Sequence, residues 1–167
     1  TTLSLDTKYV SADAAKWVLV SAADFTPPTM SFVIDEQYTT STNSLQAWWS
    51  GFDSESGIQR YEYAIGTTPG STNVKGWTNA GTATSVTIGG LSLSVGTKYY
   101  ISVRAVNGYG LTSSPLTSSG VTIARAVATI AQAKGYADGE VIGLPPLSVS
   151  AAFPGVFYIE ESNRTSG

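Results

Sequence analysis

The sequence contains no cysteine and no histidine, and only 13% of its 167 residues are charged. Without cysteine, neither a disulfide framework nor a thiolate metal site can form. Without histidine, the commonest general base and metal ligand are missing, so a Ser-His-Asp or Cys-His catalytic group cannot be built. There is no nucleophile motif and no phosphate-binding glycine loop either. We therefore expect no enzymatic activity, no catalytic residues and no cofactor.

Charge and hydropathy argue against two further classes of partner. The 9 Lys and Arg residues are scattered and the net charge is −3, so no basic stripe is present to hold a nucleic acid. The sequence contains no run of about 18 apolar residues, so it predicts no membrane span.

Sparse charge and many Ser and Thr residues favour an extracellular or cell-surface protein. The chain begins at Thr1 without a signal-peptide pattern, so either a leader has been removed or this is a piece of a longer protein.

Apolar residues alternate with polar ones through the middle of the chain, which places one set on one face of a strand. The strongest runs are Leu45–Trp49, Tyr61–Ile65 and Tyr99–Ala105, and the turn residues of Asp53–Gly57 separate the first two. About seven short strands at spacings of roughly 10 residues predict an all-β fold, an antiparallel sandwich of immunoglobulin-like architecture. The predicted core residues are Trp49, Tyr61, Tyr63, Tyr99, Ile101 and Val103.

Weaker patterns predict the other parts of the sandwich. We expect strands at Ser31–Asp35, Ala83–Ile88 and Ser119–Ile123, a polar loop at Tyr38–Asn43, and a short edge segment that includes Val74 and Trp77.

Three motifs give this region a specific resemblance. They are Leu45-x-Ala47-x-Trp49, then Ser56-Gly57-Ile58-x-x-Tyr61-x-Tyr63-Ala64-Ile65-Gly66, and Leu91 ahead of Gly96-Thr97-x-Tyr99-x-Ile101-x-Val103-x-Ala105-x-Asn107. On these residues, positions 27–123 resemble a fibronectin type III domain of the bacterial kind. The resemblance implies that Trp49 is the core tryptophan and that the Tyr99 hydroxyl bonds a backbone group near Leu91. There is no Arg-Gly-Asp triplet, so integrin binding of that kind is not implied.

Segments of different character flank this domain. Residues 1–26 form an N-terminal extension with two apolar patches, Thr2–Val10 and Lys16–Ser21, which we interpret either as two short strands or as an extension that packs on the domain. Residues 124–135 are a linker, a strand or one short helix. The patterns at Ala137–Leu144 and Phe157–Glu161 resemble the start of an oligonucleotide/oligosaccharide-binding-like β-barrel of bacterial surface proteins, so residues 124–167 are expected to hold a linker and a partial β domain.

A half-made barrel needs further strands, because a two-stranded hairpin is marginal alone in water. The exposed edges at Val156, Phe157 and Ile159 would recruit partners, and the N-terminal patch with Trp17 and Leu19 has the character to supply them. The first hypothesis is a surface filament whose copies join by strand complementation. The alternative is a fragment of a large secreted protein, a glycoside hydrolase or an adhesin, in which the domain is a spacer or a carbohydrate-binding accessory.

Three smaller signals remain open to two interpretations. Trp48, Trp77, Tyr100 and Tyr109 are expected on the surface, where they form a protein interface or stack on a polysaccharide; unpaired edges favour the interface. The Asp53-Ser54-Glu55 loop has carboxylates spaced for calcium, but an ordinary loop with an Asx-turn is favoured, and no metal is expected. Asn163 starts the pattern Asn163-Arg164-Thr165, which is either an N-glycosylation site or, as with most such matches in a bacterial protein, unused.

Overall fold

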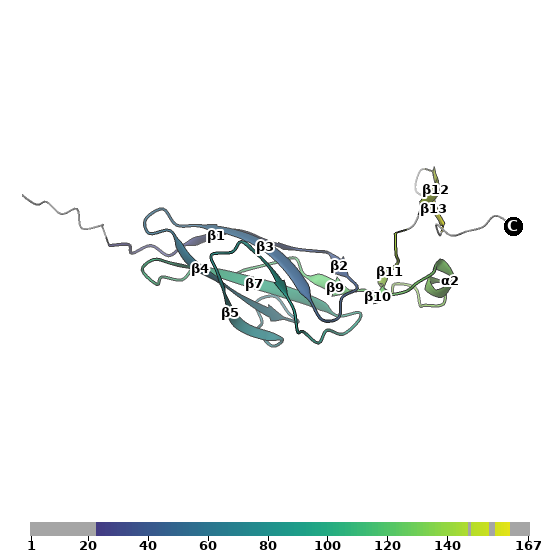
Figure 1. Ribbon diagram of the computed structural model, residues 1–167, viewed down its shortest axis with the longest axis horizontal. Helices are drawn as coiled ribbons and strands as arrows, with labels where there is room; N and C mark the ends of the chain where they lie inside the picture. Colours follow the sequence, from purple (N-terminus) through teal and green to yellow (C-terminus); the bar gives the residue numbers. More distant parts are fainter. Residues whose placement is uncertain (1–22, 147, 154–155, 161–167) are drawn as a thin grey trace, which may run out of the picture.

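The computed structural model describes residues 23–146, 148–153 and 156–160. Two mainly antiparallel sheets pack against each other as an all-β sandwich (Figure 1), which confirms the predicted fold class. The first sheet has the order β1–β3–β6, with β1 at Thr29–Asp35, β3 at Leu45–Phe52 and β6 at Ser85–Ile88. The second has the order β2–β9–β7–β4–β5, with β8 also paired to β7; the bounds are β2 Tyr38–Thr39, β4 Ile58–Gly66, β5 Lys75–Gly81, β7 Lys98–Asn107, β8 Leu116–Thr117 and β9 Val121–Ile123.

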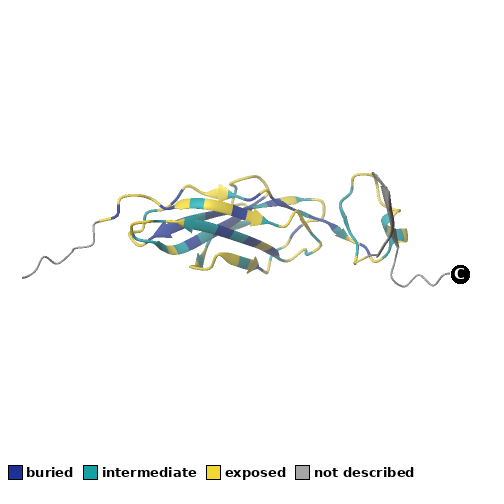
Figure 2. Cartoon of the chain, turned by 90° about the horizontal axis from the view of Figure 1, so that it is seen from above, coloured by how far each residue is buried: buried dark blue, intermediate teal, exposed yellow. Residues whose placement is uncertain are grey.

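The core lies between the two sheets because each strand turns its apolar set inward. Exposed and buried positions alternate along the strands (Figure 2), as in β3, where Leu45, Ala47 and Trp49 are buried. The Trp49 ring lies 6.1 Å from that of Tyr61 and 6.4 Å from that of Tyr63, centroid to centroid. All six residues expected in the core belong to this buried cluster: Trp49, Tyr61, Tyr63, Tyr99, Ile101 and Val103.

The Tyr99 side chain is hydrogen-bonded to the loop that precedes its own strand, β7. Its hydroxyl accepts a hydrogen bond of 2.9 Å from the backbone N–H of Ser94. The partner therefore lies three residues after Leu91, close to where the fibronectin-like resemblance placed it.

The last strand, expected at Ser119–Ile123, is present as β9, but the two-residue strand β8 ahead of it was not predicted. The segment 111–123 forms β8 and β9 with irregular chain between them. Serine hydroxyls replace the missing strand contacts: Ser113 Oγ accepts from the N–H of Ala105 at 2.9 Å, and Ser118 Oγ accepts from the N–H of Ile101 at 3.0 Å. Buried backbone donors of β7 are thus satisfied without a continuous partner strand.

One further expectation for the sandwich was wrong. The polar loop expected at Tyr38–Asn43 begins with β2, which pairs in parallel with β9. The edge segment expected around Trp77 is confirmed as β5, a seven-residue strand at the edge of the second sheet that pairs with β4.

The chain continues past the sandwich into small elements. β10 (Arg125–Ala126) pairs in parallel with β11 (Ile142–Gly143), and between them lies α2 (Ile130–Ala133), whose N-cap Thr129 accepts from the N–H of Gln132. Segment 124–135 therefore holds both a strand and a helix, two of the three structures that the sequence left open. β12 (Ser148–Phe153) pairs with β13 (Val156–Glu160) in a separate antiparallel sheet. Within the described residues these pieces do not close a barrel.

Candidate functional site

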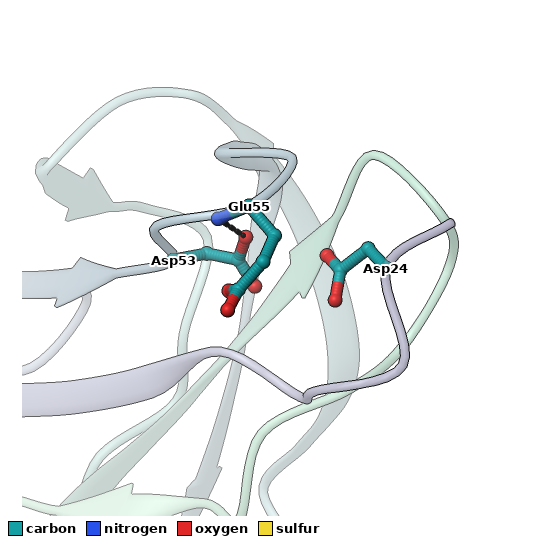
Figure 3. Close-up of side chains that lie close together, drawn as sticks. All are labelled: Asp24, Asp53 and Glu55. Atoms are coloured by element: carbon teal, nitrogen blue, oxygen red, sulfur yellow. Dashed lines mark hydrogen bonds between the residues drawn. The ribbon is translucent and has the colours of Figure 1, made fainter. Parts of the chain in front are cut away.

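An acidic cluster lies at the end of the sandwich where the chain enters it (Figure 3). Asp24 precedes β1, while Asp53 and Glu55 belong to the turn between β3 and β4. One carboxylate oxygen from each residue lies within 4.8 Å of the others. Asp24 is buried, with 4% of its surface exposed, whereas Glu55 is exposed. Sequence reasoning considered Asp53 and Glu55 together but missed Asp24, because nothing in the linker pattern indicates a contact with a turn so far along the chain.

Asn107, the last residue of β7, fills the space between the two aspartates. It is fully buried, and its amide nitrogen donates to Asp24 Oδ2 at 2.7 Å and to Asp53 Oδ2 at 3.1 Å. Its amide oxygen accepts from the backbone N–H groups of Leu111 at 2.8 Å and Tyr109 at 3.1 Å. These two backbone donors fix the orientation of the amide, so Asn107 presents donors, not an oxygen ligand, to the carboxylates.

The Asp53 carboxylate organises its own turn. Its Oδ1 accepts from the backbone N–H groups of Ser56 at 2.8 Å, Gly57 at 3.0 Å and Glu55 at 3.2 Å. The bond from Ser56 does most to lower the pKa of Asp53; partial desolvation opposes it, and the bonds from Asn107, Gly57 and Glu55 add to it. This is the Asx-type turn that the sequence favoured over a calcium loop.

The cluster is tied together by hydroxyl groups as well. Ser56 Oγ donates to Asp24 Oδ2 at 2.5 Å, and Asp24 Oδ1 accepts from the backbone N–H of Thr26 at 2.8 Å. Three carboxylates of this kind are ligands that Ca²⁺ accepts. However, Asn107 and Ser56 already donate to Asp24 Oδ2, and Asn107 also donates to Asp53 Oδ2. The arrangement thus links the entering chain, one turn and the end of β7.

The predicted interface residues are distributed over separate parts of the molecule. Trp17, Leu19 and Asn163 lie outside the described residues. Val156, Phe157 and Ile159 belong to β13. Trp48 lies on the outer face of β3 and is partly exposed, and Trp77 lies on β5 in the other sheet.

Trp77 already has an intramolecular partner. The Arg104 guanidinium stacks over its ring at 4.3 Å from the centroid, and Arg104 also pairs with Glu62 at 2.7 Å. Arg60 pairs with the same Glu62 carboxylate at 2.8 Å. Partial burial acts to raise the pKa of Glu62, but the hydrogen bonds and positive charges of Arg60 and Arg104 outweigh it and lower the pKa. Trp77 is therefore part of a cross-strand network and offers less free ring surface than the sequence suggests.

A second surface feature was missed at the sequence level. Phe32, Ile34 and Phe52 lie on the outer face of the first sheet beside Trp48, and 44%, 52% and 66% of their respective surfaces are exposed. We call Phe32, Ile34, Trp48 and Phe52 the aromatic face, after its three aromatic members. The signal was present in the sequence, because Phe32, Val33 and Ile34 are consecutive apolar residues, and period-two geometry turns such a run toward both faces of a strand.

Comparisons with known proteins identify no family by sequence. No family model matches the chain, and no curated protein matches it. Among solved structures, a crystal structure of domains from titin is 22% identical, with a TM-score of 0.44, over 59% of this chain and 32% of that one. A titin module from human cardiac muscle is 18% identical, with a TM-score of 0.42, over 60% of this chain and 94% of that one. A human fibronectin type III (FNIII) domain is 17% identical, with a TM-score of 0.39, over 65% of this chain and 91% of that one.

The chain thus spans about a third of the first of these structures. The assignment of the sandwich fold depends on the sheet order and the buried core of this chain, and not on its similarity to these solved structures. Among the residues that are described, no helix has the length and apolar character needed to cross a membrane.

Proposed function

We propose that the chain is an extracellular structural protein whose copies join by strand addition into a surface filament. The observation that supports this is the β12–β13 sheet. Its two strands pair with each other from Ser148↔Glu160 to Phe153↔Val156, and within the described residues neither strand has a third partner. A two-stranded hairpin is marginally stable alone in water, and a free strand edge offers backbone donors and acceptors to another strand.

The arrangement of the sandwich suits a head-to-tail contact. Segment 23–28 joins the sandwich at one end, and β10 to β13 lie beyond the opposite end (Figure 1). A contact between two different parts of the chain is heterologous, and it extends into a filament when it does not close into a ring. The proposed donors are the apolar patches of residues 1–21, with Trp17 and Leu19 in the second patch.

The test compares two proline variants of the full chain. Proline removes a backbone donor and disfavours a paired strand. Leu19→Pro falls inside the proposed donor patch, and Ala22→Pro, its matched control, falls just outside it. Sedimentation velocity over a range of concentrations should show assembly for the parent chain and for Ala22→Pro, and monomers for Leu19→Pro.

Electron microscopy of the parent chain provides the second measurement. Filaments are expected at high concentration. Monodisperse monomers at every concentration contradict the proposal and favour the alternative, a spacer or accessory domain in a longer secreted protein.

A further inference from the structure

The outward positions of the first sheet carry no charged residue. The solvent face of an antiparallel sheet is ordinarily polar, and a contiguous exposed apolar patch marks an interaction site. Here the inward positions of β1, β3 and β6 hold the core, and the alternate positions point to solvent. Those outward residues are Thr29, Phe32, Ile34, Gln46, Trp48, Ser50, Phe52, Ser85 and Thr87.

The four members of the aromatic face are neighbours across the β1–β3 pair. Ile34 lies directly opposite Trp48, and Phe32 lies opposite Ser50. Phe32 is therefore diagonal to both Trp48 and Phe52, at about 7–8 Å between backbones, within reach of aromatic side chains. The apolar surface is thus continuous along two strands.

The size of this surface limits what can occupy it. From the exposed fractions of Phe32, Ile34 and Phe52, and about 200 Å² for a fully exposed large side chain, these three side chains expose roughly 300 Å², and the partly exposed Trp48 adds to it. A stable protein interface buries about 800 Å² on each partner, a little over half of it apolar. A second copy of the chain docked here alone would bury too little, whereas a narrow, chain-like ligand fits.

Polar groups beside the apolar surface indicate the chemistry of that ligand. Gln46, Ser85 and Thr87 on β3 and β6 supply amide and hydroxyl groups on the same face. At this end of the sheet lies a hollow of about 220 Å³, which Gln46 and Thr87 line together with the polar residues Glu36, Thr39 and Ser44, and with Leu45 and Val121. Gln46 and Thr87 thus belong both to the outward face of the sheet and to the hollow.

We propose that this face binds a neutral polysaccharide. Sugar rings have apolar C–H faces, which stack on aromatic side chains, and hydroxyl edges, which pair with amide, hydroxyl and carboxylate groups. The face bears no charge, and the single carboxylate at the hollow, Glu36, accepts hydroxyl donors and repels an anionic chain. The site is independent of strand addition at β13.

The experiment measures retention of the full chain by polysaccharides in affinity gel electrophoresis. The probes are hydroxyethyl cellulose, xyloglucan, galactomannan and, as the anionic comparison, polygalacturonate. At least one neutral probe should retain the parent chain, and polygalacturonate should not. Trp48→Ala and Phe32→Ala should each weaken retention by roughly tenfold, and Trp48→Phe should keep most of it, because the ring surface carries the contact.

Trp77→Ala is the matched control, since it removes a tryptophan from the other sheet. It should leave retention unchanged, and thermal unfolding of each variant checks that the sandwich is intact. The proposal is overturned if none of the three neutral polysaccharides retains the parent chain, or if Trp77→Ala weakens retention as much as Trp48→Ala. It is also overturned if Trp48→Ala changes the oligomeric state while retention stays the same, which would assign the face to a second copy.

Discussion

The amide of Asn107 donates a 2.7 Å hydrogen bond to the carboxylate of Asp24, which lies 83 positions earlier in the chain and outside every strand. The contact fixes the segment that enters the sandwich against the far end of β7. Because Asp24 is buried, its carboxylate oxygens need hydrogen-bond donors from the protein.

We expect Asn107→Ala to lower the free energy of unfolding by about 2–3 kcal/mol, since it leaves a buried carboxylate short of a donor. Denaturant unfolding measures the change. Asn79→Ala, at an exposed position of β5 where the side chain accepts one bond from the backbone N–H of Gly81, is the control and should cost about 1 kcal/mol or less. If the two substitutions lower the free energy of unfolding equally, the buried Asn107 contact stabilises the fold no more than an exposed asparagine does.

Calcium is expected to leave the melting temperature of the chain unchanged. A cation among Asp24, Asp53 and Glu55 would have to displace the Asn107 amide and the Ser56 hydroxyl, which already donate to the carboxylates of Asp24 and Asp53. Differential scanning calorimetry with calcium and with a chelator makes the comparison. A clear rise in melting temperature with calcium would mean that the cluster rearranges into a metal site.

Acid should destabilise the fold in part through Asp53. Its pKa is held below the ordinary value of about 3.9, chiefly by the N–H of Ser56, against partial desolvation. A depressed pKa gives stability that is fully present above the ordinary value and is lost as the pH falls through the folded-state pKa. Denaturant midpoints measured between pH 7 and pH 2 should therefore fall less steeply on the acid side for Asp53→Asn than for the parent chain. If the midpoints of Asp53→Asn and of the parent chain fall equally with pH, Asp53 does not contribute to the loss of stability in acid.

Tyr99→Phe should cost about 1–2 kcal/mol, because the Ser94 N–H loses its acceptor while the ring stays in the core. Tyr109→Phe, at a residue that is half exposed, should be close to neutral. Thermal unfolding of both variants measures the difference, and a neutral Tyr99→Phe would argue against the hydroxyl contact.

The sandwich could be predicted from sequence where burial repeats with the strand period. Leu45, Ala47 and Trp49 alternate cleanly because one face of β3 is buried. Long-range polar contacts leave no such local pattern. Asp24 resembles an ordinary linker residue, and Asn107 ends a strand motif that gives no sign of its partner. The pairing of Trp77 with Arg104 depends on the β5–β4–β7 strand order.

Strand β8 and the aromatic face were missed for different reasons. Serine hydroxyls can take the place of a backbone acceptor, so the polar sequence around Ser113 and Ser118 gives no sign of which strand contacts survive. The run Phe32-Val33-Ile34 did contain the necessary signal, since adjacent apolar residues on one strand point to opposite faces.

Amide hydrogen exchange of Val156–Glu160, followed at low and at high protein concentration, tests the central proposal most directly. If a neighbouring copy supplies the missing strand, these amides exchange fast in dilute monomers and become protected as the concentration rises, and removal of residues 1–21 abolishes the protection. Fast exchange at every concentration contradicts strand addition, and so does full protection in the dilute monomer, because the hairpin would then need no second copy.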